Sequence, residues 1–429
     1  MMPAPGRRLA LHVGDRIRFD LAPAGPDGAH AFVRTTLGRD AQVRAEAQAP
    51  ATHRRALAGA AWRDVPMRRT AAGWSVDLTC TEPGFFLGKP YLIDADGTTH
   101  WPAGADVGLS VHSGRWRSGN TIYCAFPRLF GPLRNRADTA DRLIADQLAV
   151  LDRHGYTVIP ASGTLRDVAQ AVPHIVERLG CRILHLLPVN PSPTVNARMG
   201  RYGSPYAGLD LTGIDPALVV FDRRTTGIDQ FRELAYTVHR HDARLFIDLA
   251  INHTGWLSRL QEEHPEWFAR NADGTFRSPG AWGTTWEDLV EIDHQHRPDL
   301  WDHLAQAFLT WCRRGVDGFR CDAGYMVPVE AWRVITSRVR EEFPDTVFLL
   351  EGLGGAWSAT EALLTDGGLQ WAYSELFQNY SGREVAAYLD HALVQNRRCG
   401  LLVHYSETHD NNRLAASGRV WSLLRNRLC

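Results

Sequence analysis

The sequence predicts an α/β fold, in which a (β/α)8 TIM-type barrel that lacks its eighth strand follows an N-terminal β-sandwich domain. Two observations lead to this fold class. Short alternating runs separated by Pro, Gly and Asp turns fill residues 1–115, which is typical of an antiparallel sandwich. From Thr121 onward, apolar strands alternate with helical stretches, which indicates a parallel sheet. We therefore predict a sandwich domain at 1–115 and an incomplete barrel domain at 116–429.

Composition is that of an ordinary globular protein, with 44% apolar residues and a net charge of −1 over 429 residues. Lys89 is the only lysine and the arginines are spread along the chain, so we expect neither a nucleic-acid nor a membrane partner. No apolar run approaches the ~18 residues of a membrane span. The seven cysteines, an odd number without CxxC spacing, indicate free thiols in a reducing compartment. A cytoplasmic location is expected.

Within the N-terminal part, Asp96-Gly97 lies between two strand-like runs and predicts a two-residue type I′ hairpin. Three tryptophans there, Trp62, Trp74 and Trp101, belong either to the core or to a sugar-stacking surface. A tryptophan in a small sandwich is more often core, so we favour the core.

Seven apolar runs predict the barrel strands. Helices are expected between them, including one at 138–154 and one from Thr164 to Gly180 with a kink or boundary at Pro173. The predicted strands are residues 121–126, 182–188, 244–250, 315–322, 346–351, 369–376 and 401–407.

Charged side chains gather at the C-terminal ends of these strands, where a barrel carries its active site. On an alternating strand Arg320 and Asp322 share one face, so the guanidinium holds the carboxylate ionised near neutral pH. Taken alone, that pair is either a nucleophile with its partner or a buried ion pair without chemistry. Further strand-end candidates, which together favour a site, are Asp248, Asn252, His253, Glu351, Glu407, His409 and Asp410.

This constellation resembles glycoside hydrolase family 13, the α-amylase family, from about residue 121 to 412. The set of motifs is specific, although any single member is not. The matching motifs are Asp248-x-x-x-Asn252-His253, Gly318-Phe319-Arg320-x-Asp322-Ala323, Glu351 at a strand end, His409-Asp410, and upstream Tyr206-x-x-x-Asp210-x-x-x-Ile214-Asp215-Pro216.

The resemblance implies three catalytic carboxyl groups. Asp322 is the expected nucleophile, Glu351 the general acid/base, and Asp410 the carboxylate that holds the hydroxyls of the sugar ring. Glu351 has no arginine beside it in its strand, so a raised pKa would let it donate a proton. The expected substrate-binding residues are Tyr206 as stacking platform, with Asp248, His253, Arg320 and His409 lining the same subsite.

The implied activity is that of a retaining glycosidase or transglycosidase, which acts on α-linked glucose oligosaccharides or polysaccharides through a covalent glycosyl-enzyme. Two alternatives stay open. One is a maltosyltransferase or other glucanotransferase, and the other is a non-catalytic or incomplete glucan-binding protein.

The chain departs from the family after the nucleophile motif, where many members have Lys-His and a calcium site and this chain has Gly324-Tyr325-Met326. We therefore expect no cofactor, with Asn252 as the one calcium candidate. The family inserts a small B domain at a place that corresponds to residues 254–297. Its aromatic residues either form the core of that insertion or stack on further glucose units; they are Trp256, Trp267, Phe268, Trp282 and Trp286.

Nineteen residues follow Asp410, and residues 420–425 are typical of the helix after strand seven. Without an eighth strand, strands one and seven would expose unpaired edges. We therefore expect this chain alone to be insoluble, partly unfolded or inactive, and to be completed by a longer reading frame or a second polypeptide. In the alternative, the N-terminal domain or an unusual pairing closes the gap.

Overall fold

The computed structural model describes residues 1–52, 58–131, 162–193 and 203–428, with residues 146–147, 150 and 153–154 between them. Most of the helix predicted at 138–154 lies outside the described residues. By its contacts the chain divides into two compact units. The first combines Met1–Ser118 with Pro328–Cys429, and the second is Gly119–Val327.

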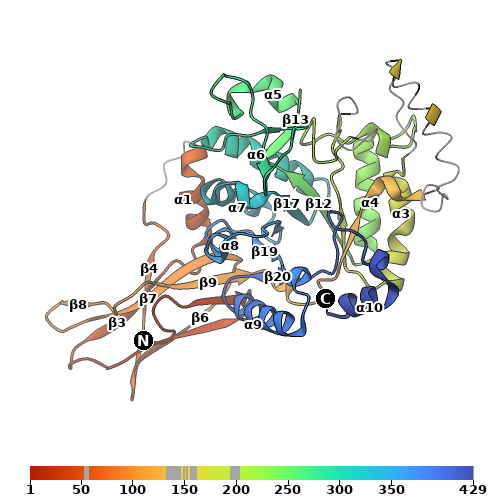
Figure 1. Cartoon of the computed structure of the whole chain (residues 1–429). Helices are drawn as coiled ribbons and strands as arrows, with labels where there is room; N and C mark the ends of the chain where they lie inside the picture. Colours follow the sequence, from red (N-terminus) through yellow and green to blue (C-terminus); the bar gives the residue numbers. More distant parts are fainter. Residues whose placement is uncertain are drawn as a thin grey trace. The chain divides into compact units, whose positions relative to one another are not determined.

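The N-terminal part of the first unit is the predicted β-sandwich (Figure 1), but it is not antiparallel throughout, because its first and ninth strands pair in parallel. Residues from both of its sheets share one core, with Phe19, Val33, Phe86 and Leu109 completely buried. One sheet has the order β1 (Arg8–His12), β9 (Val107–His112), β7 (Gly84–Ile93), β3 (His30–Thr35) and β4 (Arg63–Pro66), with β8 (Thr99–His100) on β7; the other has β2 (Arg16–Leu21), β6 (Gly73–Thr79) and β5 (Arg68–Thr70).

The turn at Asp96-Gly97 joins β7 to β8 as antiparallel strands, but the predicted two-residue type I′ turn is wrong. The N–H of Asp94 donates to the carbonyl of Thr98 at 2.9 Å, so the loop between them holds three residues. Only Gly97 has a positive φ there, +88°, whereas a type I′ turn needs two such residues. The extra residue confines the left-handed conformation to glycine.

Helix α1 (Asp40–Thr52) lies between β3 and β4 in the sequence and is not predicted. Alanine, the best helix former, recurs along it and Pro50 falls in its last turn. It packs against α7 (Val329–Glu342), as Figure 1 shows. A helix of the sandwich and a helix of the barrel segment therefore share one interface within the first unit.

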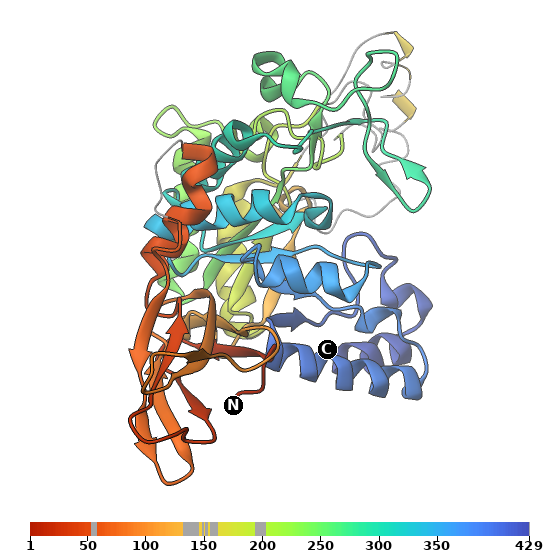
Figure 2. The same cartoon turned by 90° about the vertical axis from the view of Figure 1, so that its left-hand side faces the viewer.

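The remainder of the first unit alternates parallel strands with helices. Helix α9 packs against β20 and also against β1 of the sandwich, and it is the long blue helix in Figure 2. The elements are α7, β18 (Val347–Leu350), α8 (Trp357–Leu364), β19 (Gln370–Tyr373), α9 (Gly382–Arg398), β20 (Leu401–Val403) and α10 (Arg419–Leu428), with β18, β19 and β20 pairing in that order.

The second unit contributes four parallel strands in chain order. Capping boxes at Thr164 and Thr226 start α3 and α4, and α3 ends at Pro173, which confirms the boundary predicted there. The strands are β10 (Ile122–Ala125), β11 (Ile183–Leu186), β12 (Arg244–Ala250) and β17 (Gly318–Asp322), and the helices are α3 (Leu165–Pro173), α4 (Gly227–Arg240) and α6 (Pro298–Cys312). Among the described residues, the two units thus contain the seven predicted strands.

The excursion between β12 and β17 holds the insertion predicted at 254–297. It is tied to the end of β12, because the buried imidazole Nε2 of His294 donates to the carbonyl of Ile251 at 2.9 Å. Its elements are β13 (His253–Gly255) paired with β16 (Leu289–Glu291), α5 (Arg259–Glu263), and the hairpin of β14 (Gly280–Ala281) and β15 (Thr284–Thr285).

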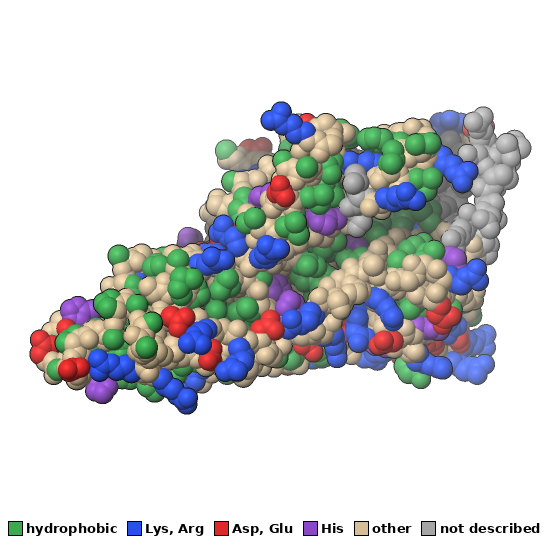
Figure 3. Space-filling model, turned by 90° about the horizontal axis from the view of Figure 1, so that it is seen from below, with side chains coloured by type: hydrophobic (Ala, Val, Ile, Leu, Met, Phe, Trp, Pro, Cys, Tyr) green, Lys and Arg blue, Asp and Glu red, His purple; other side chains and the backbone are tan. Residues whose placement is uncertain are grey.

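The mixed charge of the composition is also seen on the surface. Acidic and basic side chains are interspersed on the face in Figure 3. None of the described helices is both long and apolar enough to cross a membrane. No disulfide links the cysteines that the structure describes, which are Cys80, Cys124, Cys181, Cys312, Cys321 and Cys399.

We predict that His294 makes the fold sensitive to acid. Burial lowers the pKa of its imidazole from 6.5 to about 4. In the unfolded chain the imidazole of His294 binds a proton below pH 6.5, whereas in the folded chain it does so only below about pH 4. The free energy of unfolding therefore falls as pH drops from 6.5 to 4. The loss is about 2 kcal/mol at pH 5.

The variant His294→Gln keeps an N–H donor for Ile251 and does not titrate. Its melting temperature should therefore decline less between pH 7 and pH 5 than that of the wild type. His30→Gln, at an exposed position on β3, is the control and should decline like the wild type. A full decline in His294→Gln would contradict the assignment.

Candidate active site

Arg320 on β17 connects two carboxylates of the second unit. Its Nη1 donates to both oxygens of Asp248, at 2.9 and 3.0 Å, and to Oδ1 of Asp322 at 2.5 Å. Asp248 on β12 pairs directly opposite Arg320, and Ala250 pairs opposite Asp322. Arg320 and Asp322 therefore lie on one face of the strand, as the alternation predicts, and the parallel register brings Asp248 to the same guanidinium.

The three charges differ in their access to water. Asp248 is 0% exposed and Arg320 1% exposed, whereas 12% of the Asp322 side chain is exposed. Burial raises the pKa of the Asp248 carboxyl well above its usual range; Arg320 opposes this rise and the negative charge of Asp322 adds to it. Burial thus works against the charge of Asp248, and Asp322 is the one of the two carboxyl groups that reaches the solvent.

Tyr206 joins the same cluster through its hydroxyl. The hydroxyl donates to Oδ2 of Asp248 at 2.9 Å and accepts from Nη1 of Arg320 at 3.2 Å. The guanidinium carbon of Arg320 lies 5.4 Å from the centre of the tyrosine ring. The upstream motif also fixes this loop, because the carboxylate of Asp210 accepts from the backbone N–H of Thr212 and of Gly213. The predicted platform residue therefore contacts the guanidinium that holds the predicted nucleophile.

His253 lies on the other side of Asp322, with its Nε2 3.5 Å from Oδ2 of that carboxylate. It is 2% exposed and its ring meets Trp286 edge to face at 6.0 Å between centroids. Sequence reasoning missed a second histidine: Nε2 of His185, on β11, lies 3.8 Å from Oδ2 of Asp248. Its signal was a lone imidazole inside an otherwise apolar strand.

Directly after Asp322, the chain turns through Ala323 with φ +45°. This left-handed conformation is uncommon for a residue other than glycine, and its strain is found mainly at functional sites. The turn ends β17 at Asp322 and leads into a short 3-10 turn, Gly324–Met326. The backbone thus leaves the strand at the carboxylate that the motif assigns as nucleophile.

Asn252 is held by its own surroundings. Its amide nitrogen lies 3.5 Å from Nδ1 of His253 and 3.5 Å from the sulfur of Met326, and neither is the oxygen ligand that calcium prefers. In the part of the chain that the structure describes, no group of three or more His, Cys, Asp and Glu residues could hold a metal ion. The calcium candidate stays a prediction.

Glu351, His409 and Asp410 belong to the first unit. Glu351 follows β18 directly, as predicted, and is half-buried. Nε2 of His409 lies 3.3 Å from Oδ2 of Asp410, whose side chain is 61% exposed. Strand β20 ends at Val403, so Glu407 does not end a strand; it pairs instead with Arg413 at 2.9 Å.

The aromatic residues of the insertion mostly pack within it. Phe268 is buried, Trp267 stacks on His264, and the indole N–H of Trp256 donates to the carbonyl of Glu287 at 2.8 Å. Trp282 differs, because it is 75% exposed at the tip of the β14–β15 hairpin with φ +49°. A place in the core of the insertion therefore does not describe Trp282, nor Trp256, which is 39% exposed.

Comparison with known proteins finds no matching protein-family model, but it finds curated relatives. Over 324 residues the chain is 31% identical to an alpha-1,4-glucan:maltose-1-phosphate maltosyltransferase of Cereibacter sphaeroides, covering 68% of this chain and 46% of the relative. A protein of the same name from Burkholderia pseudomallei is 27% identical over 428 residues, with 81% and 37% covered. The chain spans about half or less of the length of these relatives.

Solved structures give the same fold. An alpha-amylase from Lactobacillus plantarum matches with a TM-score of 0.52 and 27% identity, covering 70% of this chain and 65% of that one. A cyclomaltodextrinase matches with a TM-score of 0.53 over 94% and 70% of the chains, at 16% identity. Both are TIM-barrel proteins of one family, which confirms the predicted fold class. The relatives, the shared barrel and the motif residues together place the chain in glycoside hydrolase family 13, the α-amylase family.

Proposed function

We propose that the chain is the catalytic part of a retaining glycosidase or transglycosidase that acts on α-linked glucose chains. Asp322 is the nucleophile, Glu351 the general acid/base and Asp410 the carboxylate that binds sugar hydroxyls. The observation that carries the proposal is the buried Arg320, which holds Asp322 at the end of β17 with His253 beside it. A carboxylate fixed in this way is placed for attack on an anomeric carbon.

The reaction proceeds in two displacements. First, the Asp322 carboxylate bonds to the anomeric carbon while the bond from that carbon to the leaving oxygen breaks, and Glu351 gives its proton to that oxygen. Then a hydroxyl of water or of an acceptor sugar loses its proton to Glu351 and attacks, and the ester bond to Asp322 breaks. Two inversions retain the α configuration, which requires carboxyl groups ~5–5.5 Å apart.

The name of the relatives favours transfer over hydrolysis. It names maltose 1-phosphate as donor and an α-1,4-glucan as acceptor. We extend this to the chain as the finer proposal: a maltosyl group moves to Asp322, phosphate leaves, and the end of a glucan accepts the group. A cytoplasmic location and a mechanism without cofactor belong to the same proposal. A non-catalytic glucan-binding protein is the rival function.

The first prediction tests the nucleophile. Asp322→Asn should lower turnover at least ~10³-fold while sugar binding survives, because the amide keeps the shape and loses the anion. Asp242→Asn is the matched control, since Asp242 is 84% exposed and asparagine tolerates its φ of +54°. Near-normal turnover in Asp322→Asn would remove this residue from the mechanism.

The second prediction separates the role of Glu351 from that of Asp322. Glu351→Gln should lower turnover of malto-oligosaccharides about 10²–10⁴-fold, the usual worth of a general acid. With α-maltosyl fluoride, whose leaving group needs little protonation, formation of the glycosyl-enzyme should suffer much less. Asp322→Asn should lose both reactions. If Glu351→Gln lowered the rate equally with both donors, Glu351 would not be the general acid.

The third prediction concerns the products. With maltose 1-phosphate and maltoheptaose, a maltosyltransferase should release phosphate and lengthen the acceptor by two glucose units, and early NMR spectra should show new linkages of α configuration only. A hydrolase would give maltose and shorter chains instead. Products of β configuration would mean that the acceptor attacks directly, and no product at all would favour the non-catalytic rival.

A further inference from the structure

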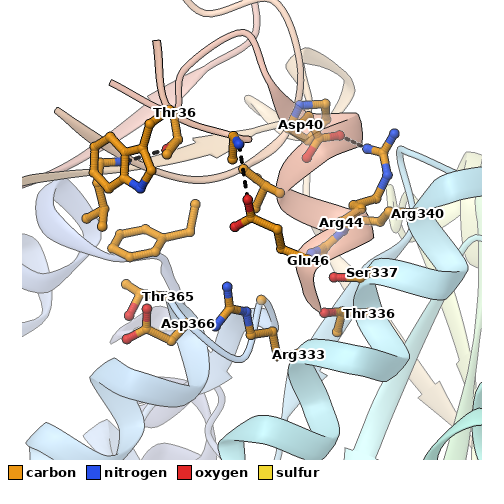
Figure 4. Close-up of a pocket in the computed structure, with 18 residues that line it drawn as sticks. Thr36, Asp40, Arg44, Glu46, Arg333, Thr336, Ser337, Arg340, Thr365 and Asp366 are labelled. Atoms are coloured by element: carbon orange, nitrogen blue, oxygen red, sulfur yellow. Dashed lines mark hydrogen bonds and ion pairs between the residues drawn. The ribbon is translucent and has the colours of Figure 1, made fainter. Parts of the chain in front are cut away.

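The first unit contains a pocket that includes none of the candidate catalytic residues. Its volume is about 160 Å³, room for roughly ten water molecules. Its walls come from α1, from the segment that opens β7, from α7 and from the loop after α8 (Figure 4). Two aromatic rings line it, those of Trp62 and Phe85.

Charges of both signs line the pocket in equal number. The cations are Arg44, Arg333 and Arg340, and the anions are Asp40, Glu46 and Asp366. Because the lining is balanced, it selects neither an anion nor a cation. It offers many donors and acceptors to a neutral, polar ligand.

Some of these groups are already engaged. Arg44 forms an ion pair with Asp40 one helical turn away. One carboxylate oxygen of Glu46 accepts from the N–H of Ala61 at 3.1 Å, and no hydrogen bond from the described residues reaches the other oxygen. Figure 4 shows Glu46 and Arg333 pointing into the pocket from opposite walls, with Asp366 beside Arg333.

Arg333 and Asp366 are the groups that remain available. Both are exposed, and within the described part of the chain neither forms an ion pair. A guanidinium presents five donors in a plane and a carboxylate presents acceptors, which suits a pair of neighbouring hydroxyl groups. A half-buried indole in the same lining, that of Trp62, offers an apolar face for the C–H side of a sugar ring.

We propose that this pocket binds one glucosyl unit of an α-glucan at a place that takes no part in catalysis. Trp62 stacks on the ring, while Arg333 and Glu46 bond its hydroxyls. The identity of the sugar rests on the proposed function, since an enzyme of α-linked glucose meets this ligand as its substrate. The binding itself rests on the lining, so the site would hold the polymer whether or not turnover occurs.

The experiment uses the full chain and two separate readouts. Binding is measured as retardation in native gels that contain glycogen. Catalysis is measured in solution as hydrolysis of maltoheptaose or as its elongation from maltose 1-phosphate. Trp62→Ala and Arg333→Gln should each weaken glycogen binding at least about tenfold, equal to about 1.4 kcal/mol. Turnover of the short substrate should stay unchanged in both variants.

Trp101→Ala is the matched control, because Trp101 is 44% exposed and stacks on Tyr91 at 4.3 Å without lining the pocket. It should bind glycogen like the wild type. Melting curves show whether each variant is folded, and Glu46→Gln replaces Trp62→Ala if the latter does not fold. The proposal would be overturned if glycogen retarded Arg333→Gln as strongly as the wild type, and also retarded as strongly whichever of Trp62→Ala and Glu46→Gln is folded. A wild type that neither hydrolyses maltoheptaose nor lengthens it from maltose 1-phosphate would overturn the proposed function alone.

Discussion

The second unit depends on one buried cation. The guanidinium of Arg320 is 1% exposed, and an uncompensated charge at that depth would cost more than a single hydrogen bond returns. Asp248, Asp322 and the hydroxyl of Tyr206 all contact it. Because removing one partner of a buried ion pair typically costs 3–5 kcal/mol, the strands and the loop that carry these groups are constrained together.

The same constraint gives the two aspartates different tasks. Asp248 has no access to solvent, so it cannot touch a sugar in this arrangement; it fixes Arg320 and Tyr206 in place. Asp322 is held by the same guanidinium but keeps part of its side chain exposed. Burial therefore favours a positioning role for Asp248, and its place among the substrate-binding residues stays a prediction.

The sequence allowed us to predict Arg320 and Asp322 on one face because strand alternation is a local rule. It did not reveal that Asp248 lies opposite Arg320, because the register of two strands 72 positions apart follows from packing. The contact of His185 with Asp248 could not be predicted for the same reason. Its partner Asp248 lies on the neighbouring strand, and a lone histidine in an apolar run carries no sign of that partner.

The sandwich shows a second limit of prediction from the sequence. We expected all three of its tryptophans in the core, but each has a different environment. Trp74 belongs to the core, Trp101 is 44% exposed and stacks on the buried Tyr91, and Trp62 lines the pocket. Residue type could not separate them, since the pocket is also lined by α1, a helix absent from the alternating pattern. The sequence pattern does not predict α1, so it cannot predict the pocket that α1 helps to line. For this reason, a sugar-binding role for Trp62 could be argued only from the structure.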